Sequence, residues 1–217
     1  ARGTGKRRAV LVICDGHRAD FLREEYCPNL VAFAGRARQF ANHRAIFPSA
    51  TRASATSIAT GCWPANHGLH GNSMGLPDGD GYRVFDVGAP EFRRQMRERI
   101  DRTLKVPTLA ERLEPHGGVI VASNVSPGAA YFHDPEHFGH VVHRAGSFGP
   151  GGKVLNGGDW PVVSHDIAGD AALTEWVCNA VLFGHRPAPA VRGLAHPAAP
   201  IHSSLHGSKP HIDAIPR

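Results

Sequence analysis

Residues 9–16 read AVLVICDG, six apolar residues followed by an acid and a glycine. A continuous apolar run of this length is typical of a parallel strand that is covered on both faces. Residues 118–125 read GVIVASNV and predict a second strand of the same kind. Because helical patterns lie between and after these runs, we predict an α/β fold with a mostly parallel sheet flanked by helices.

Glycine and proline set the expected limits of the other elements. The stretch around residues 132–160 is rich in His, Gly and Pro, and it predicts a loop-rich insertion within a single domain that spans residues 1–217. Further extended segments are expected at residues 39–47 and 188–195. Helices are expected at five places, the second with a serine cap: residues 28–34, 51–60, 91–100, 108–113 and 167–182.

The composition limits the class of protein. Of the 217 residues, 41% are hydrophobic and 20% are charged, which is typical of a globular protein. The net charge is +5, but arginine is spread along the chain, so a surface that attracts anionic substrates explains it better than nucleic-acid binding. No apolar run reaches the roughly 18 residues that cross a bilayer. With no signal-peptide pattern at the start, we expect no membrane association and a cytoplasmic location.

Asp15 directly follows the first predicted strand and precedes Gly16. Ligands of parallel α/β sheets bind beyond the carboxyl ends of the strands, so a carboxylate there is a candidate metal ligand. An aspartate that only stabilises the turn is an equally good explanation at this stage.

Residues 47–51 read FPSAT and lead into the helix expected at 51–60. Unpaired N–H groups and the helix dipole favour anions at a helix N-terminus, and a hydroxyl there can become a nucleophile if a metal ion lowers its pKa. Thr51 is therefore a candidate nucleophile, although Ser49 or Thr51 could merely cap the helix. Arg52 could help to hold a substrate phosphate, or it could simply be solvated.

Residues 67–72 read HGLHGN, a glycine-flanked loop that ends in an amide. Asn72 could donate a hydrogen bond to a phosphoryl oxygen and stabilise charge in the transition state. Gly-Asn is also an ordinary turn sequence, so the motif alone decides nothing.

Together these motifs resemble the type I phosphodiesterase/nucleotide pyrophosphatase family of the alkaline phosphatase superfamily. Residues 11–20 (LVICDGHRAD) resemble its opening strand, and residues 27–30 (CPNL) resemble the start of its next helix. Residues 47–51 match its nucleophile loop, and residues 61–72 (GCWPANHGLHGN) match the segment that follows. Four matches in the right order at suitable spacing are far more specific than any one of them.

The resemblance implies an alkaline-phosphatase-like fold whose complete site holds two Zn²⁺ ions and acts on a small phosphate ester or a nucleotide. Asp15 and His202 would bind metal, and Thr51 would be the metal-activated nucleophile that forms a phospho-threonine intermediate. Asn72 would hold a phosphoryl oxygen. A sulfatase-like activity is disfavoured, because no cysteine lies near Thr51.

The resemblance weakens near the C-terminus. Where the family has EPD-x-x-x-H, His202 matches the histidine, but Ala198 replaces the aspartate and His196 replaces the glutamate. The family's later Asp-His pair and final histidine are absent from these 217 residues. We therefore predict a sheet that is incomplete at its C-terminal side, and little or no activity from these residues alone. The function expected is a metal-dependent phosphodiesterase or nucleotide pyrophosphatase, and the alternative is a truncated or eroded, inactive relative.

A second histidine-rich stretch could also bind metal. Its members have helical spacing, but Pro135 and Gly139 interrupt the helix, so a surface loop is the better prediction. The histidines are His133, His137, His140 and His143.

Overall fold

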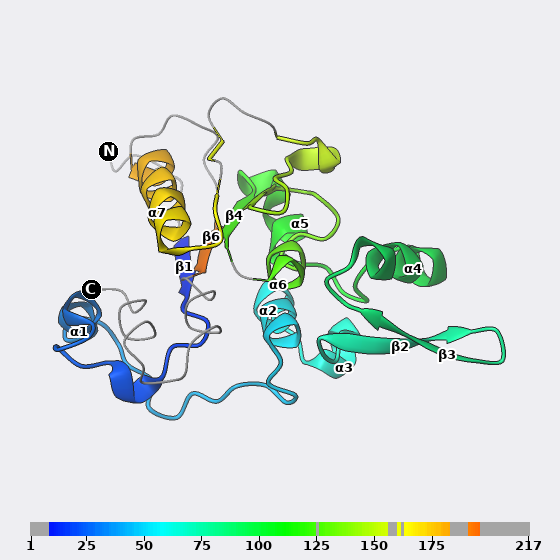
Figure 1. The fold of residues 1–217 in the computed structure, drawn as a ribbon, viewed down its shortest axis with the longest axis horizontal. Helices are drawn as coiled ribbons and strands as arrows, with labels where there is room; N and C mark the ends of the chain where they lie inside the picture. Colours follow the sequence, from blue (N-terminus) through cyan, green and yellow to red (C-terminus); the bar gives the residue numbers. More distant parts are fainter. Residues whose placement is uncertain (1–8, 125, 156–159, 162, 183–190, 196–217) are drawn as a thin grey trace, which may run out of the picture.

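The computed structural model describes residues 9–124, 126–155, 160–161, 163–182 and 191–195. Within these ranges the chain forms a parallel sheet and an antiparallel hairpin (Figure 1). The parallel sheet has the strand order β1-β6-β4-β5. Its strands are β1 (Ala9–Ile13), β4 (Val119–Ser123), β5 (His140–His143) and β6 (Val191–Ala195). The predicted α/β class with a mostly parallel sheet is confirmed.

Helices cover both faces of this sheet. Helices α5 (Leu109–Leu113) and α6 (Pro127–Tyr131) pack on one face, where Val121 of β4 is buried. Helix α7 (Ile167–Leu182) packs on the other face, where the next residue of the strand, Ala122, is buried. Successive residues of a strand point to opposite faces, so β4 contributes to two separate apolar clusters.

Strand β1 is less covered than its apolar sequence predicts. Val10 and Val12 are each 53% exposed, whereas all five residues of β4 are buried. In the described part of the chain β1 pairs only with β6, so it lies at an edge of the sheet, while β4 pairs on both sides. The prediction of a strand covered on both faces is confirmed for β4 and wrong for β1.

Local start and stop signals place the predicted helices correctly. Helix α1 (Pro28–Ala34) has proline at its first position, and α2 (Thr51–Thr60) ends at Gly61 with a φ of 69°. Only glycine adopts this left-handed conformation without strain. Helices α4 (Pro90–Ile100), α5 and α7 also lie within a residue of the expected limits.

Three segments differ from the predictions. Residues 39–47 contain turns and irregular structure rather than a strand. Residues 132–160, predicted to be loop-rich, contain β5, a strand of the main sheet. The hairpin of β2 (Ser73–Asp78) and β3 (Gly81–Asp86) was not predicted, because glycine and proline interrupt its alternation of apolar and polar residues. Short helices also form at Ala19–Phe21 (η1), Pro64–His67 (α3), Glu114–His116 (η2) and Pro150–Gly152 (η3).

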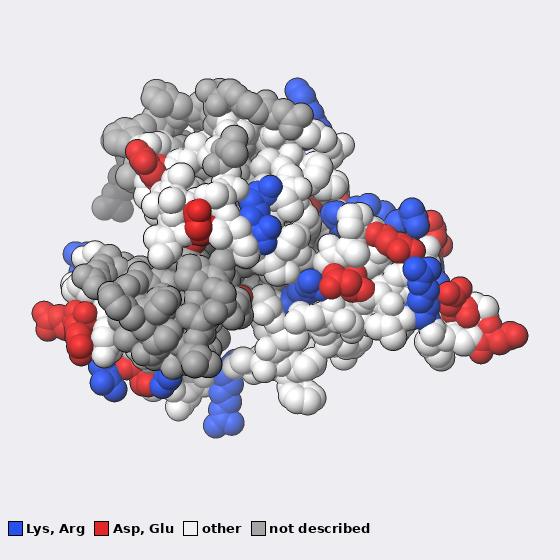
Figure 2. Space-filling model, viewed as in Figure 1, with Lys and Arg blue, Asp and Glu red and all other residues white. Residues whose placement is uncertain are grey.

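The hairpin and α4 form a lobe beside the sheet, with its own apolar cluster. Phe85 of β3, Phe92 and Met96 of α4, and Phe132 pack there. On the face shown in Figure 2, basic and acidic side chains intermix over this lobe, and Arg94 pairs with Glu98 along α4. None of the helices in the described ranges combines the length and the apolarity that a membrane span requires.

A buried histidine fixes the connection between α2 and α3. His67 is fully buried, its Nδ1 accepts the N–H of Leu69 at 3.1 Å, and its Nε2 lies 2.9 Å from the Ser57 hydroxyl. Because Nδ1 is an acceptor, Nε2 carries the proton and donates a hydrogen bond to the Ser57 hydroxyl. Burial, aided by the charge of His70, lowers the pKa of His67 from 6.5 to about 4. The imidazole is therefore neutral at pH 7.

Acidification from pH 7 to pH 5 is expected to lower the free energy of unfolding by roughly 2 kcal/mol through His67. The pKa of His67 is lower in the folded chain, so the unfolded chain binds more protons between about pH 4 and 6.5. The free energy of unfolding therefore decreases as the pH is lowered through this window. Urea unfolding at both pH values, in the unaltered chain and in His67→Gln, measures this contribution. An equal loss in both chains would show that His67 is not its source.

Candidate active site at the carboxyl edge of the sheet

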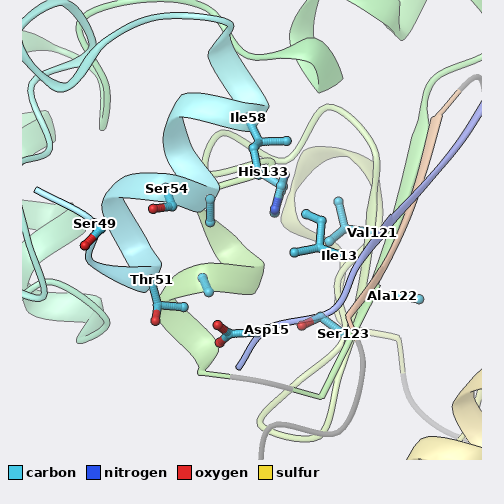
Figure 3. A pocket seen from close by; sticks show the side chains of 12 residues that line it. Ile13, Asp15, Ser49, Thr51, Ser54, Ile58, Val121, Ala122, Ser123 and His133 are labelled. Carbon is cyan, nitrogen blue, oxygen red and sulfur yellow. The ribbon is translucent and has the colours of Figure 1, made fainter. Parts of the chain in front are cut away.

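A pocket of about 140 Å³ opens where the N-terminal half of α2 faces the ends of β1 and β4 (Figure 3). Its inner wall is apolar except for His133, and the other polar groups lie toward the end that holds Asp15 and Thr51. The pocket lies at the carboxyl ends of parallel strands, where α/β proteins bind their ligands. It is lined by Ile13, Asp15, Ser49, Thr51, Ser54, Ala55, Ile58, Val121, Ala122, Ser123, Ala129 and His133.

The structure brings together two of the predicted site residues. Asp15 lies two residues beyond the end of β1, and Thr51 is the first residue of α2. Both side chains are partly buried, and the Asp15 carboxylate points toward the Thr51 side chain (Figure 3). Both residues line the same end of the pocket, so a ligand bound there would lie close to a carboxylate and to a residue that carries a hydroxyl.

The capping explanation for this motif is wrong. Ala50 occupies the N-cap of α2, and an alanine side chain cannot accept a hydrogen bond from the helix N–H groups. Ser49 lies before the cap and lines the pocket, and Thr51 is already helical. The hydroxyls predicted as caps therefore lie at the pocket.

Asn72 lies beside the first turn of α2, outside the wall of the pocket. It is exposed, and its Oδ1 accepts the backbone N–H of Arg52 at 3.4 Å. This contact satisfies an N–H of the helix terminus from a loop 20 residues away in the sequence. With Oδ1 accepting this N–H, the amide nitrogen is the donor that the Asn72 side chain can offer to a ligand.

The interpretation of Arg52 as a solvated side chain is wrong, and its contact with a substrate phosphate stays a prediction. Its side chain is only 15% exposed, so it is not a solvated arginine. Its guanidinium donates to protein acceptors: the carbonyl of Asn72, the carboxylate of Asp86 and the hydroxyl of Ser126. Its Nε and Nη1 are thus committed to the fold and do not point at a ligand.

His133 lines the inner part of the pocket and was not among the predicted site residues. Burial lowers its pKa to about 4, so the imidazole is neutral at physiological pH. The sequence assigned this histidine to a loop, because its neighbours are turn formers. The missed signal is its position two residues after α6, the helix that follows β4.

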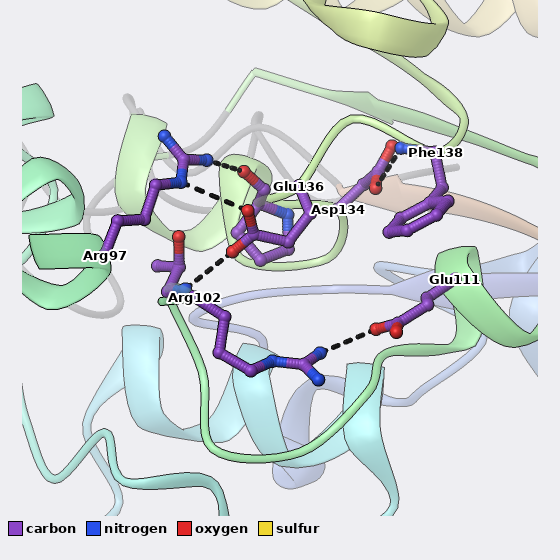
Figure 4. Close-up of polar contacts among 8 residues, drawn as sticks. Arg97, Arg102, Glu111, Asp134, Glu136 and Phe138 are labelled. Carbon is purple, nitrogen blue, oxygen red and sulfur yellow. Dashed lines mark hydrogen bonds and ion pairs between the residues drawn. The ribbon is translucent and has the colours of Figure 1, made fainter. Parts of the chain in front are cut away.

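A polar network fixes the turn that follows His133 (Figure 4). The Asp134 carboxylate accepts the N–H groups of Phe138 and Gly139 at 2.9 and 2.7 Å. Glu136 accepts the N–H of Thr103 at 2.6 Å and pairs with Arg97 at 3.1 Å. The turn is therefore tied both to itself and to α4.

The other histidines of this stretch pack individually against aromatic rings. His137 lies 5.3 Å from the ring centre of Phe148, and His140 stacks on Trp160 at 5.4 Å. His143 contacts Tyr131 at 5.5 Å. Their helical spacing has no structural counterpart, because part of the stretch is strand β5.

The residues described by the structure fit part of a metal site. They include no group of three or more His, Cys, Asp or Glu side chains that could hold a metal ion. Zinc normally takes three or four protein ligands, and Asp15 and Thr51 supply two ligand side chains. The predicted ligand His202 lies outside the described residues, as do Ala198 and His196.

The fold and the site define an α/β protein whose candidate active site lies at the carboxyl edge of a parallel sheet. Residues 9–147 match the sequence profile described as type I phosphodiesterase / nucleotide pyrophosphatase. The match covers more than half of the chain and includes Asp15, Thr51, Asn72 and His133. The protein therefore belongs to this family, within the alkaline phosphatase superfamily.

Solved structures support the same fold. The chain is similar to phosphonoacetate hydrolase from Sinorhizobium meliloti 1021 in complex with phosphonoformate, with 18% identity and a TM-score of 0.68. The complex of that enzyme with phosphonoacetate gives 16% identity and a TM-score of 0.64. Both comparisons cover 96% of this chain and 50% of the other, so this chain spans half the length of the hydrolase. No curated protein sequence matches it significantly.

Proposed function

We propose that this protein is a metal-dependent hydrolase of phosphodiester or pyrophosphate bonds that uses Thr51 as its nucleophile. The observation that supports this proposal most directly is the position of Thr51. Its side chain lies at the first turn of α2 and faces the Asp15 carboxylate at the carboxyl edge of the sheet (Figure 3). Family membership supplies the reaction class.

The residues have separate roles in the proposed reaction. Thr51 Oγ1 forms a bond to phosphorus while the bond from phosphorus to the leaving oxygen breaks, and water then hydrolyses the phospho-threonine. The N–H groups of the first turn of α2 and the Asn72 amide donate hydrogen bonds to the phosphoryl oxygens. Asp15 is the proposed zinc ligand, with His202 as a second. Bound zinc supplies a lowered pKa for a coordinated hydroxyl and neutralises phosphoryl charge.

Small phosphate esters or nucleotides are the proposed substrates. The hydrolase with the similar fold was crystallised with phosphonoformate and phosphonoacetate, both small phosphorus oxyanions. A pocket of about 140 Å³ beside a helix N-terminus suits a phosphoryl group. Among the described residues that line it, Asp15 is the one acid, so these residues oppose an anion with a single negative charge.

The proposal predicts that Asp15→Asn weakens zinc binding by roughly 100-fold or more, because loss of a ligand should exceed the roughly 10- to 100-fold effects of changing residues that only hydrogen-bond to the ligands. Zinc titration by calorimetry measures the affinity, and hydrolysis of a chromogenic phosphodiester with added zinc measures the activity. Asp20→Asn is the matched control, since Asp20 is half-exposed and pairs with Arg18. Equal zinc affinity in both variants would refute the role of Asp15.

A second candidate is an inactive relative that only binds an anion. The observation that favours this candidate is the small number of possible metal ligands, because the described residues include no group of three or more that could hold a metal ion. The same assay separates the two candidates. Zinc-dependent hydrolysis above the blank supports the hydrolase, and its complete absence supports the inactive relative.

A further inference from the structure

We propose that Arg52 is a positioning residue, which fixes the relative placement of Thr51 and Asn72 from behind the site. Its Nη1 donates to the Asn72 carbonyl at 2.7 Å and to the Asp86 carboxylate at 2.8 Å. Its Nε donates to the Ser126 hydroxyl at 3.3 Å, and its backbone N–H donates to the Asn72 side chain at 3.4 Å. One residue thus joins the start of α2, the loop before β2, the end of β3 and the start of α6.

The surroundings of the guanidinium are shaped to hold it. A Cβ added at Gly88 would lie 2.8 Å from Arg52 Nη2, and one added at Gly128 would lie 2.6 Å from Nε. These two glycines therefore permit the close approach of the arginine, and any other residue would displace it. The Asp86 carboxylate that pairs with Arg52 also accepts the N–H of Gly88 at 2.7 Å.

Arg52 acts on the site through its neighbours. Adjacent residues of a helix point about 100° apart, so Thr51 faces the pocket while Arg52 faces the Asn72 loop. Among the described residues of this first turn, Arg52 makes the two hydrogen bonds that link the helix to Asn72. Loss of the side chain would leave Thr51 in its helix and the Asn72 carbonyl bonded to the Val87 N–H at 3.0 Å, but it would remove the side-chain contact that holds Asn72 against the helix.

This inference rests on the proposed function, because positioning matters only if Thr51 and Asn72 act on the same phosphoryl group. A lysine could keep the ion pair with Asp86, but it lacks the planar fork that reaches the Asn72 carbonyl and Ser126 together. The conservative Arg52→Lys variant therefore separates the effect of charge from the effect of geometry.

The test compares the unaltered chain with Arg52→Gln, Arg52→Lys and Arg102→Gln, each with added zinc. Arg102 is the matched control, since it is also partly buried and pairs with Glu111 at 2.7 Å, outside the residues that line the pocket (Figure 4). Arg52→Gln is expected to lower kcat for a chromogenic phosphodiester by roughly 100-fold, with a much smaller change in KM. Arg52→Lys is expected to have a kcat between those of Arg52→Gln and the unaltered chain. Arg102→Gln is expected to keep kcat.

Two further measurements do not depend on turnover. Amide exchange is expected to show protection of the residue 52 N–H in the unaltered chain and faster exchange in Arg52→Gln. Inorganic phosphate, followed through the amide signals of α2, is expected to bind more weakly to that variant.

The outcomes distinguish failure of the positioning role of Arg52 from failure of the proposed hydrolase function. If Thr51→Ala abolishes turnover while Arg52→Gln keeps kcat and phosphate affinity, the positioning role alone is overturned. If Arg102→Gln loses kcat as much as Arg52→Gln does, the effect is general destabilisation and the positioning role is again overturned. If the unaltered chain neither turns over the ester nor binds phosphate, the proposed function is overturned and this inference with it.

Discussion

Replacing Thr51 with alanine is expected to abolish phosphoryl transfer, with a fall in rate on the order of 10³-fold or more. The hydroxyl is the only part of the Thr51 side chain that can form a bond to phosphorus. A water molecule that replaced it in Thr51→Ala would not be held in place by a covalent bond to the helix. The residue lies at the first position of α2 and faces Asp15 across the pocket (Figure 3). The substitution leaves the helix intact, because alanine is the best helix former.

Covalent trapping measures this effect even where turnover is slow. Acid quenching of the chain with a chromogenic phosphodiester and zinc, followed by mass spectrometry of the peptides, should find the phosphoryl group on Thr51, still carrying the second ester substituent of the substrate, and none in Thr51→Ala. Thr51→Ser keeps a hydroxyl and is expected to retain the adduct.

Two neighbouring hydroxyls provide matched controls. Ser49 and Ser54 line the same pocket, so Ser49→Ala and Ser54→Ala remove an oxygen from it without touching the proposed nucleophile. Both variants are expected to keep the phosphorylated Thr51. An adduct that persists in Thr51→Ala and disappears in Ser54→Ala would assign the nucleophile to Ser54 instead.

Replacing Phe132 with alanine is expected to lower the free energy of unfolding by about 3–5 kcal/mol. The side chain is fully buried, and its ring lies edge-on to Phe92 at 6.3 Å. It follows α6, which packs on the sheet, and its cluster belongs to the hairpin lobe. The truncation therefore opens a cavity where the two parts of the molecule meet.

Urea unfolding at pH 7 measures the loss, and Phe40→Ala is the matched control. Phe40 is 73% exposed, so its truncation is expected to change stability by no more than about 0.5 kcal/mol. A loss for Phe132→Ala that equals the loss for Phe40→Ala would show that the lobe does not depend on this ring.

The sequence alone predicted the α/β class, the limits of α1, α2 and α7, and the buried strand β4. These features depend on local signals such as Pro28, Gly61 and continuous apolar runs, and such signals act within a few residues of one another. The motifs around Asp15, Thr51 and Asn72 also identified the family, because their order along the chain is itself sequence information.

Other features needed the tertiary structure. Strands β1 and β4 have similar apolar sequences, yet only β4 is buried, because burial depends on how many strands and helices surround a strand. Arg52 follows Thr51 in the sequence, but its partners Asp86 and Ser126 lie 34 and 74 residues away.

The position of His133 also depends on the tertiary structure rather than on its neighbours in the sequence. Its neighbours in the sequence predict a surface loop, and the fold places it in the inner part of the pocket, 82 residues beyond Thr51 in the chain. Propensity and spacing describe interactions along the chain, whereas a site is made by segments that meet only after the sheet has formed. The sequence thus identified the candidate site residues Asp15, Thr51 and Asn72, and the tertiary structure decided which residues line the pocket together and which residues support them.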